Sequence, residues 1–253
     1  MRPQRRTMGR LLCLLRIGGP KARGPRGKLN AHAPVFHWRG GRQWHKSHGM
    51  RTLFHFPLCP GSRTIRLVLG EKRLPFEAIV ERAWEQRPEF LALNPAGNVP
   101  VLVEDNGLIV PSAYVISEYL EEAYSDTPLL GRTLAERVEV RRVVSWFDTL
   151  FAREVSGRFI DERVMKRLSG RGNPDGGALR DAYAAMRPLM RYVNDLAEAR
   201  NWLGGSFLSL ADFTAAAHLS CLDFIGDRSE ERRVGTACRS RWSPPHLTKT
   251  LTD

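Results

Sequence analysis

The stretch from Leu91 to Val110, LALNPAGNVPVLVEDNGLIV, decides the fold. It holds two apolar runs, Val99–Val103 and Leu108–Val110, on either side of Asp105-Asn-Gly107. An Asn-Gly pair between apolar runs is a strong hairpin signal, because the turn needs residues that accept a positive φ. The stretch therefore predicts two adjacent antiparallel strands.

Working outward from this hairpin, the flanking sequence predicts an α/β domain. Arg51–Phe56 is a short strand-like run, and helical spacing follows over Ser62–Lys72. Pro75–Val80 reads as a second strand, which must run parallel to the first if the helix is a crossover. Ser112–Ala123 presents an apolar helical face. The order β-α-β-(α)-β-β-α is that of a thioredoxin-like domain, which we place at residues 50–123.

The second half of the chain shows helical spacing only. After a linker over 124–132, the sequence predicts an all-α helical domain over 133–227 with at least four helices: Thr133–Val155, Arg158–Leu168, Ala178–Arg200 and Leu210–Ile225. Ser209-Leu-Ala-Asp212 is a capping-box pattern, so we expect Ser209 and Asp212 to stabilise the last helix rather than to act in catalysis. His218, beside apolar residues of that helix, is expected to be a buried core histidine.

The net charge of +12 comes from the ends of the chain. Residues 1–49 hold 12 of the 39 basic residues and none of the 27 acidic ones, and residues 228–253 hold six basic and three acidic. The part between them therefore has 21 basic and 24 acidic residues. A nucleic-acid-binding domain is expected to be basic in its own right, so the sequence predicts no nucleic-acid partner.

The two ends differ from the middle in composition. Residues 1–49 are rich in Arg, Gly and Pro, and fit an organellar presequence, a basic arm or, the interpretation we favour, non-native sequence translated upstream of Met50. Residues 228–253 resemble a tail that recurs on unrelated proteins, which indicates an artefactual segment. We therefore base the fold on residues 50–227.

Metal and membrane sites are not predicted. The four cysteines, Cys13, Cys59, Cys221 and Cys238, lack metal-ligand spacing and suit a reducing cytosol. No apolar stretch approaches the roughly 20 residues that a membrane-spanning helix needs.

The segment Leu91–Pro100 resembles the part of glutathione S-transferases that leads into a cis-proline. The resemblance implies a glutathione S-transferase fold and a cis bond between Val99 and Pro100. In that family the backbone before the cis-proline pairs with the cysteinyl part of glutathione, so the resemblance makes Val99 and Pro100 glutathione-binding candidates.

Cys59 and Ser62 are the candidate catalytic residues. The resemblance places them in the loop where the family carries its activating Ser, Tyr or Cys, and Cys59-Pro-Gly-Ser62 is also similar to glutaredoxin-like loops. A thiol at a helix N-terminus is expected to have a lowered pKa, because the helix dipole favours the thiolate. The alternative is that Ser62 caps the helix and Cys59 is inert. The sequence leaves both interpretations open.

Pro111-Ser112 departs from the family pattern, which has Glu or Gln before this serine. Ser112 and the helix N-terminus can still receive the γ-glutamyl carboxylate of glutathione. Pro111 supplies no acceptor for the glutathione ammonium, and losing such a charged hydrogen bond costs roughly 1.5–3 kcal/mol. Glutathione is therefore a doubtful cofactor for this chain.

Several strings, among them Arg141–Asp148, Glu162–Leu168 and Asn201–Gly205, closely resemble FtsZ-localised, transferase-like division proteins of alphaproteobacteria. This resemblance implies a cytoplasmic homodimer that binds FtsZ without catalysis. Trp84, in a polar stretch with no periodic core to join, is the candidate partner contact. The alternative is that Trp84 covers the edge of the domain interface, and the sequence leaves both interpretations open. The alternative function is a glutathione-dependent transferase or thiol oxidoreductase acting on small electrophiles, so enzymatic activity stays an open question.

Overall fold

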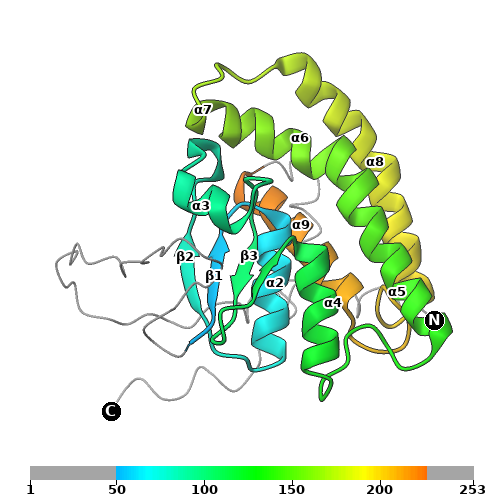
Figure 1. The fold of residues 1–253 in the computed structure, drawn as a ribbon. Helices are drawn as coiled ribbons and strands as arrows, with labels where there is room; N and C mark the ends of the chain where they lie inside the picture. The colour runs from blue at the N-terminus through cyan, green and yellow to red at the C-terminus, as the bar shows by residue number, and fades with distance from the viewer. Residues whose placement is uncertain (1–49, 227–253) are drawn as a thin grey trace, which may run out of the picture.

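The structure is a computed structural model that describes residues 50–226. The predictions made above for 1–49 and 228–253 lie outside the described residues. Figure 1 shows a sheet domain packed beside a layer of long helices.

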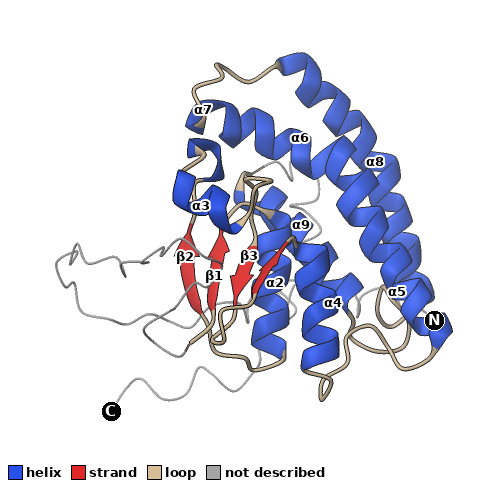
Figure 2. Ribbon diagram, in the orientation of Figure 1, coloured by secondary structure: helices blue, strands red, loops and turns tan. Residues whose placement is uncertain are grey.

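The first half is a four-stranded mixed sheet with helices on both faces (Figure 2). Its elements are β1 (Thr52–His55), α2 (Pro60–Glu71), β2 (Glu77–Val80), the 3₁₀ turn η1 (Ala83–Glu85), α3 (Pro88–Leu93), β3 (Val101–Val103), β4 (Ile109–Pro111) and α4 (Ala113–Ala123). The strand order is β2-β1-β3-β4. β1 runs parallel to β2 and antiparallel to β3, and β3 and β4 form the predicted hairpin. The thioredoxin-like order is confirmed.

The strands separate two hydrophobic clusters because successive side chains point to opposite faces of a sheet. Leu53 and Leu102 belong to the large cluster with α2 and α4. Phe54 and Val101 point the other way and pack with Phe90 of α3. The short apolar runs of the sequence are therefore buried on both faces.

The named elements of the second half are all helical among the described residues. Its elements are α5 (Leu134–Trp146), the π-helical segment η2 (Phe147–Ser156), α6 (Gly157–Ile160), the π-helical segment η3 (Asp161–Met165), α7 (Lys166–Leu168), α8 (Gly176–Ala199) and α9 (Leu210–Phe224). Residues 134–168 keep helical backbone angles throughout, so the prediction of two separate helices here was wrong. At the expected break, Gly157 allows the wide turn, since a Cβ there would lie 2.5 Å from the Ala152 carbonyl oxygen.

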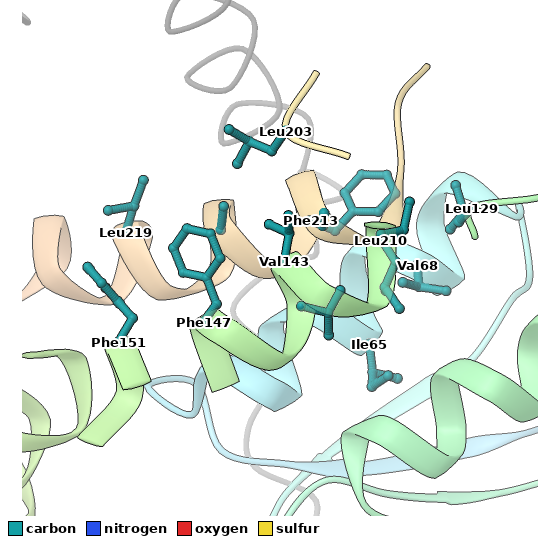
Figure 3. Close-up of a cluster of buried hydrophobic side chains, with 14 of the residues drawn as sticks. Ile65, Val68, Leu129, Val143, Phe147, Phe151, Leu203, Leu210, Phe213 and Leu219 are labelled. Atoms are coloured by element: carbon teal, nitrogen blue, oxygen red, sulfur yellow. The ribbon is translucent and has the colours of Figure 1, made fainter. Parts of the chain in front are cut away.

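The two halves share one hydrophobic core. Figure 3 shows Ile65 and Val68 of α2 in one cluster that also holds Val143 of α5, Phe147 of η2 and Phe213 of α9. Almost every residue of α9 from Leu210 to Leu222 is buried. Removal of this apolar surface from water is the main force that joins the halves.

Asp212 ties the start of α9 to the preceding loop. Its Oδ2 accepts hydrogen bonds from the Ser209 amide at 3.0 Å and the Ser209 hydroxyl at 2.8 Å. Its Oδ1 accepts one from the Leu203 amide at 2.8 Å. The structural role predicted for this pair is confirmed.

Across residues 50–226, no helix has the length and apolar character that crossing a bilayer requires.

Candidate functional site

The sequence candidates from distant parts of the chain meet where α2 and α4 begin. Gly61 marks the meeting point: a Cβ there would lie 3.0 Å from the Ala113 Cβ and 3.6 Å from the Pro100 Cδ. Glycine at this position therefore lets the N-terminus of α2 approach both α4 and the turn before β3. The Val99–Pro100 bond is cis, as the resemblance implied.

Cys59 caps α2 with its side chain. Its Sγ accepts a hydrogen bond from the Ser62 amide at 3.4 Å and lies 3.6 Å from the Val99 carbonyl oxygen, to which the thiol donates. The cap satisfies one of the amides that a helix N-terminus leaves unpaired. The thiol and the backbone before the cis-proline are thus in direct contact.

The prediction of a lowered Cys59 pKa was wrong. Although the side chain keeps some exposure to solvent, burial raises its pKa, and the negative charge of Asp148 adds to the rise. Hydrogen bonds from Ser62 and Gly61 at the helix N-terminus act in the opposite direction but are outweighed. Burial wins because the thiolate loses more by leaving water than it gains from the amides.

Ser62 lies in the first turn of α2 and is fully buried. Its Oγ accepts a hydrogen bond from the Phe56 amide at 3.3 Å, which holds the loop that carries Cys59. This contact is structural, and a catalytic role for Ser62 stays a prediction.

Ser112 begins α4 with an unusual backbone. Its φ of +74° and ψ of 133° are rarely adopted by residues other than glycine, and its side chain makes no capping hydrogen bond. The Ser112 amide donates to the Pro100 carbonyl oxygen at 3.1 Å, which connects it to the cis-proline turn. The preceding Pro111 ends β4 opposite Val101. The start of α4 therefore lies beside Pro100.

Trp84 lies in η1 and has a neighbour that the sequence did not reveal. Its ring packs edge-on against Phe56, with the ring centroids 5.2 Å apart, and its side chain is half-buried. Neither ring belongs to a hydrophobic core cluster, which agrees with the expectation that Trp84 has no core to join. The Phe56–Trp84 pair leaves an aromatic edge at the surface near the loop of Cys59.

Asp148 is a neighbour of the site that the sequence did not reveal. His218 is buried, and its two ring nitrogens contact the Ser156 hydroxyl at 2.7 Å and Asp148 Oδ1 at 3.1 Å. This confirms His218 as a satisfied core histidine. The contact also holds Asp148 at the boundary between the halves, where its charge affects Cys59. No local pattern marks Asp148, since the two groups that it affects, Cys59 before α2 and His218 of α9, are both far from it in the sequence.

The described residues contain no group of three or more His, Cys, Asp or Glu side chains that could hold a metal ion. What the site offers is a neutral thiol, backbone groups around a cis-proline and a helix N-terminus that can receive an anion.

Comparisons with known proteins relate this geometry to a family. Residues 53–128 match the sequence profile of the glutathione S-transferase N-terminal domain. FtsZ-localized protein A of Caulobacter vibrioides is 50% identical over 180 residues, which cover 70% of this chain and 79% of that protein. The structure of FzlA from C. crescentus is similar with a TM-score of 0.70 at 46% identity, covering 78% of this chain and 89% of that one. A glutathione S-transferase from Rhodospirillum rubrum F11 has a TM-score of 0.71 at 42% identity, covering 80% and 94%.

Proposed function

Because this chain belongs to the glutathione S-transferase family, we propose that it is a non-catalytic regulator of bacterial cell division that binds FtsZ in the cytoplasm. The observation that carries the proposal is the 50% identity to FtsZ-localized protein A over 180 residues. Fold alone would not decide, because this scaffold serves both enzymes and binding proteins.

The chemistry around Cys59 supports a non-catalytic role. A thiol whose pKa is raised by burial is mostly protonated at neutral pH, and only the thiolate is a strong nucleophile. Pro111 offers no side-chain acceptor for the ammonium group of glutathione. The protonated thiol and the missing acceptor would both lower the activity of a transferase, but neither would affect a surface that binds a protein.

Co-sedimentation with FtsZ filaments tests the proposal. We expect the chain to pellet with polymerised FtsZ and the variant Trp84→Ala to pellet much less, because a half-buried tryptophan at the surface is a typical hot-spot residue. Leu168→Ala, which removes an exposed apolar side chain on α7, serves as the matched control. A chain that is folded by circular dichroism and stays in the supernatant would refute FtsZ binding. If Trp84→Ala pelleted with FtsZ as fully as the wild-type chain, Trp84 would be excluded as a contact residue, but FtsZ binding itself would stand.

An exposed apolar surface on α4 and α5 supports the homodimer. It consists of the large apolar side chains left exposed on these helices: Tyr114, Val115, Leu134 and Val138. Arg141 of α5 donates two hydrogen bonds, of 2.9 and 2.7 Å, to Glu118 of α4. Val138 lies one turn from Arg141 on α5, and Val115 lies one turn from Glu118 on α4. The ion pair therefore connects the exposed apolar side chains of the two helices into one surface, the α4–α5 surface.

Sedimentation equilibrium tests the dimer. We expect the wild-type chain to sediment as a dimer and Val138→Glu as a monomer, because a charge in the middle of the α4–α5 surface cannot be buried without a partner. Leu168→Glu is the control and should stay dimeric. A monomeric wild-type chain would contradict the proposal.

The alternative, a glutathione-dependent transferase or thiol oxidoreductase, is favoured by the contact between Cys59 and the Val99 carbonyl. It predicts that reduced glutathione binds, with contributions from Val99, Pro100 and Ser112. A calorimetric titration separates the two functions. A dissociation constant well below the millimolar range would support the enzyme, and absence of heat from a folded sample would leave the FtsZ-binding proposal as the better one.

A further inference from the structure

Two arginines on one side of α2 have no acidic partner in the part of the chain that the structure describes. Arg63 and Arg66 are three residues apart, so their side chains are neighbours on the helix. Arg63 donates to the Pro57 carbonyl oxygen at 2.6 Å and to the Ser220 hydroxyl at 2.7 Å, and neither acceptor is charged. Arg66 is half-buried. Within residues 50–226, no carboxylate forms an ion pair with either guanidinium.

His55, which lies close enough to Arg66 to be affected by its charge, adds a ring nitrogen without a partner among residues 50–226. Its side chain is 5% exposed, and its Nδ1 has no hydrogen-bond partner within the described part of the chain. Burial, together with the charge of Arg66, lowers the pKa of His55 to about 4. Burial and the charge of Arg63 likewise lower the pKa of Arg66. Within residues 50–226, the group therefore combines two positive charges that no carboxylate pairs with and a buried ring nitrogen without a hydrogen-bond partner, an arrangement that an anion would stabilise.

Phe224, at the end of α9, gives this group an apolar neighbour. Its side chain is 72% exposed, and the Arg63 guanidinium carbon lies 5.9 Å from its ring centroid. A ligand on the arginines would therefore also lie against an aromatic ring. The planar guanidinium of an arginine favours a carboxylate, which it can bind through two parallel hydrogen bonds.

We propose that His55, Arg63 and Arg66, with Phe224 at their edge, form a site for an acidic peptide segment that carries an apolar residue next to its carboxylate. The site goes beyond FtsZ binding as proposed above and does not depend on it. A free phosphate would satisfy the arginines but would leave Phe224 uncovered, so the apolar neighbour favours a peptide.

The test is an NMR titration of the full chain with N-acetyl-Glu-Leu-amide, compared with N-acetyl-Gln-Leu-amide. The glutamate peptide should shift the Arg66 side-chain NεH signal saturably and raise the pKa of His55, and the glutamine peptide should do neither. Arg66→Gln should weaken binding at least tenfold. Arg73→Gln, which removes an exposed charge next to the end of the same helix, should bind like the wild-type chain.

Two results would overturn the site. Equal shifts with both peptides would show that the carboxylate is not recognised. Inorganic phosphate that binds as tightly as the glutamate peptide, with no change in peptide affinity in Phe224→Ala, would exclude the assignment to a peptide. The His55 pKa is measured in the wild-type chain, so this readout does not depend on whether a variant folds.

Discussion

Lys72 and Glu121 form a buried ion pair, with 2.7 Å between Nζ and Oε1 and side chains that are 1% and 9% exposed. The same ammonium donates to the carbonyl oxygens of Tyr124 and Thr127, each at 2.8 Å. Glu121 Oε2 accepts from the backbone amides of Leu129 and Leu130 at 2.9 and 3.1 Å. This pair therefore connects the end of α2, α4 and the segment between the two halves.

Removing one partner of this pair should destabilise the fold strongly. Lys72→Met leaves the Glu121 carboxylate buried without its counter-charge, and breaking a buried pair in this way costs about 3–5 kcal/mol. Urea unfolding measures the loss. Arg73→Met, at the neighbouring exposed residue, should change stability by less than about 0.5 kcal/mol. A similar small loss for Lys72→Met would contradict the role given to the pair.

Cys59 should react slowly with thiol reagents. Its raised pKa keeps the thiol protonated at neutral pH, and only the thiolate is a strong nucleophile. In a chain that carries Cys13→Ser and Cys238→Ser, the rate of alkylation should rise with pH and reach half its maximum only above pH 9. Cys221, whose pKa burial raises to about 12, should contribute little. Cys59→Ser is the control, and a midpoint below pH 8 would disprove the assignment.

Ser112→Gly should stabilise the protein by about 1 kcal/mol. Backbone strain of this kind costs about 1–3 kcal/mol in residues with a side chain, and glycine removes it at an entropic cost of about 0.5–1 kcal/mol. The serine hydroxyl makes no cap that could be lost. Ser117→Gly, inside the same helix, should instead be destabilising by about 1 kcal/mol. Thermal unfolding of both variants would distinguish the two effects.

His55 should make stability fall between pH 6.5 and 4. The unfolded chain takes up the proton near pH 6.5, whereas the folded chain does so only near pH 4. The contribution of His55 to the free energy of unfolding is therefore fully present above pH 6.5 and is lost as the pH falls towards 4. The total loss is at most about 3 kcal/mol. The measurement compares urea unfolding of the wild-type chain and His55→Gln in buffers without carboxylate. Identical pH profiles would rule out the contribution of His55.

Asp212→Ala should destabilise the fold by more than a simple helix cap would. Its carboxylate accepts hydrogen bonds from the backbone amides of both Ser209 and Leu203. Each buried amide left unpaired lowers the free energy of unfolding by about 1–3 kcal/mol. We expect a loss of at least about 2 kcal/mol in thermal or urea unfolding. Asp195→Ala, at an exposed residue of α8, is the control. Unchanged stability would mean that the capping assignment is incorrect.

The sequence by itself determined the features that depend on local spacing. The hairpin at Asp105-Asn-Gly107 and the cap at Ser209 follow from short-range preferences of a few residues, and both were predicted correctly. The cis bond before Pro100 came from a family resemblance rather than from spacing. The boundary near Gly157 was predicted wrongly, because a glycine can either end a helix or permit a wide turn, and only neighbouring packing selects between them.

Only the tertiary structure decided the chemical state of the site residues. The pKa of Cys59 depends on burial and on Asp148, which is 89 residues away in the chain, so the local rule for a helix N-terminus gave the wrong direction. The pairing of Lys72 with Glu121 and the closeness of His55 to Arg66 likewise join separate elements. A local pattern selects backbone geometry, whereas desolvation and charge depend on every element that packs around a group.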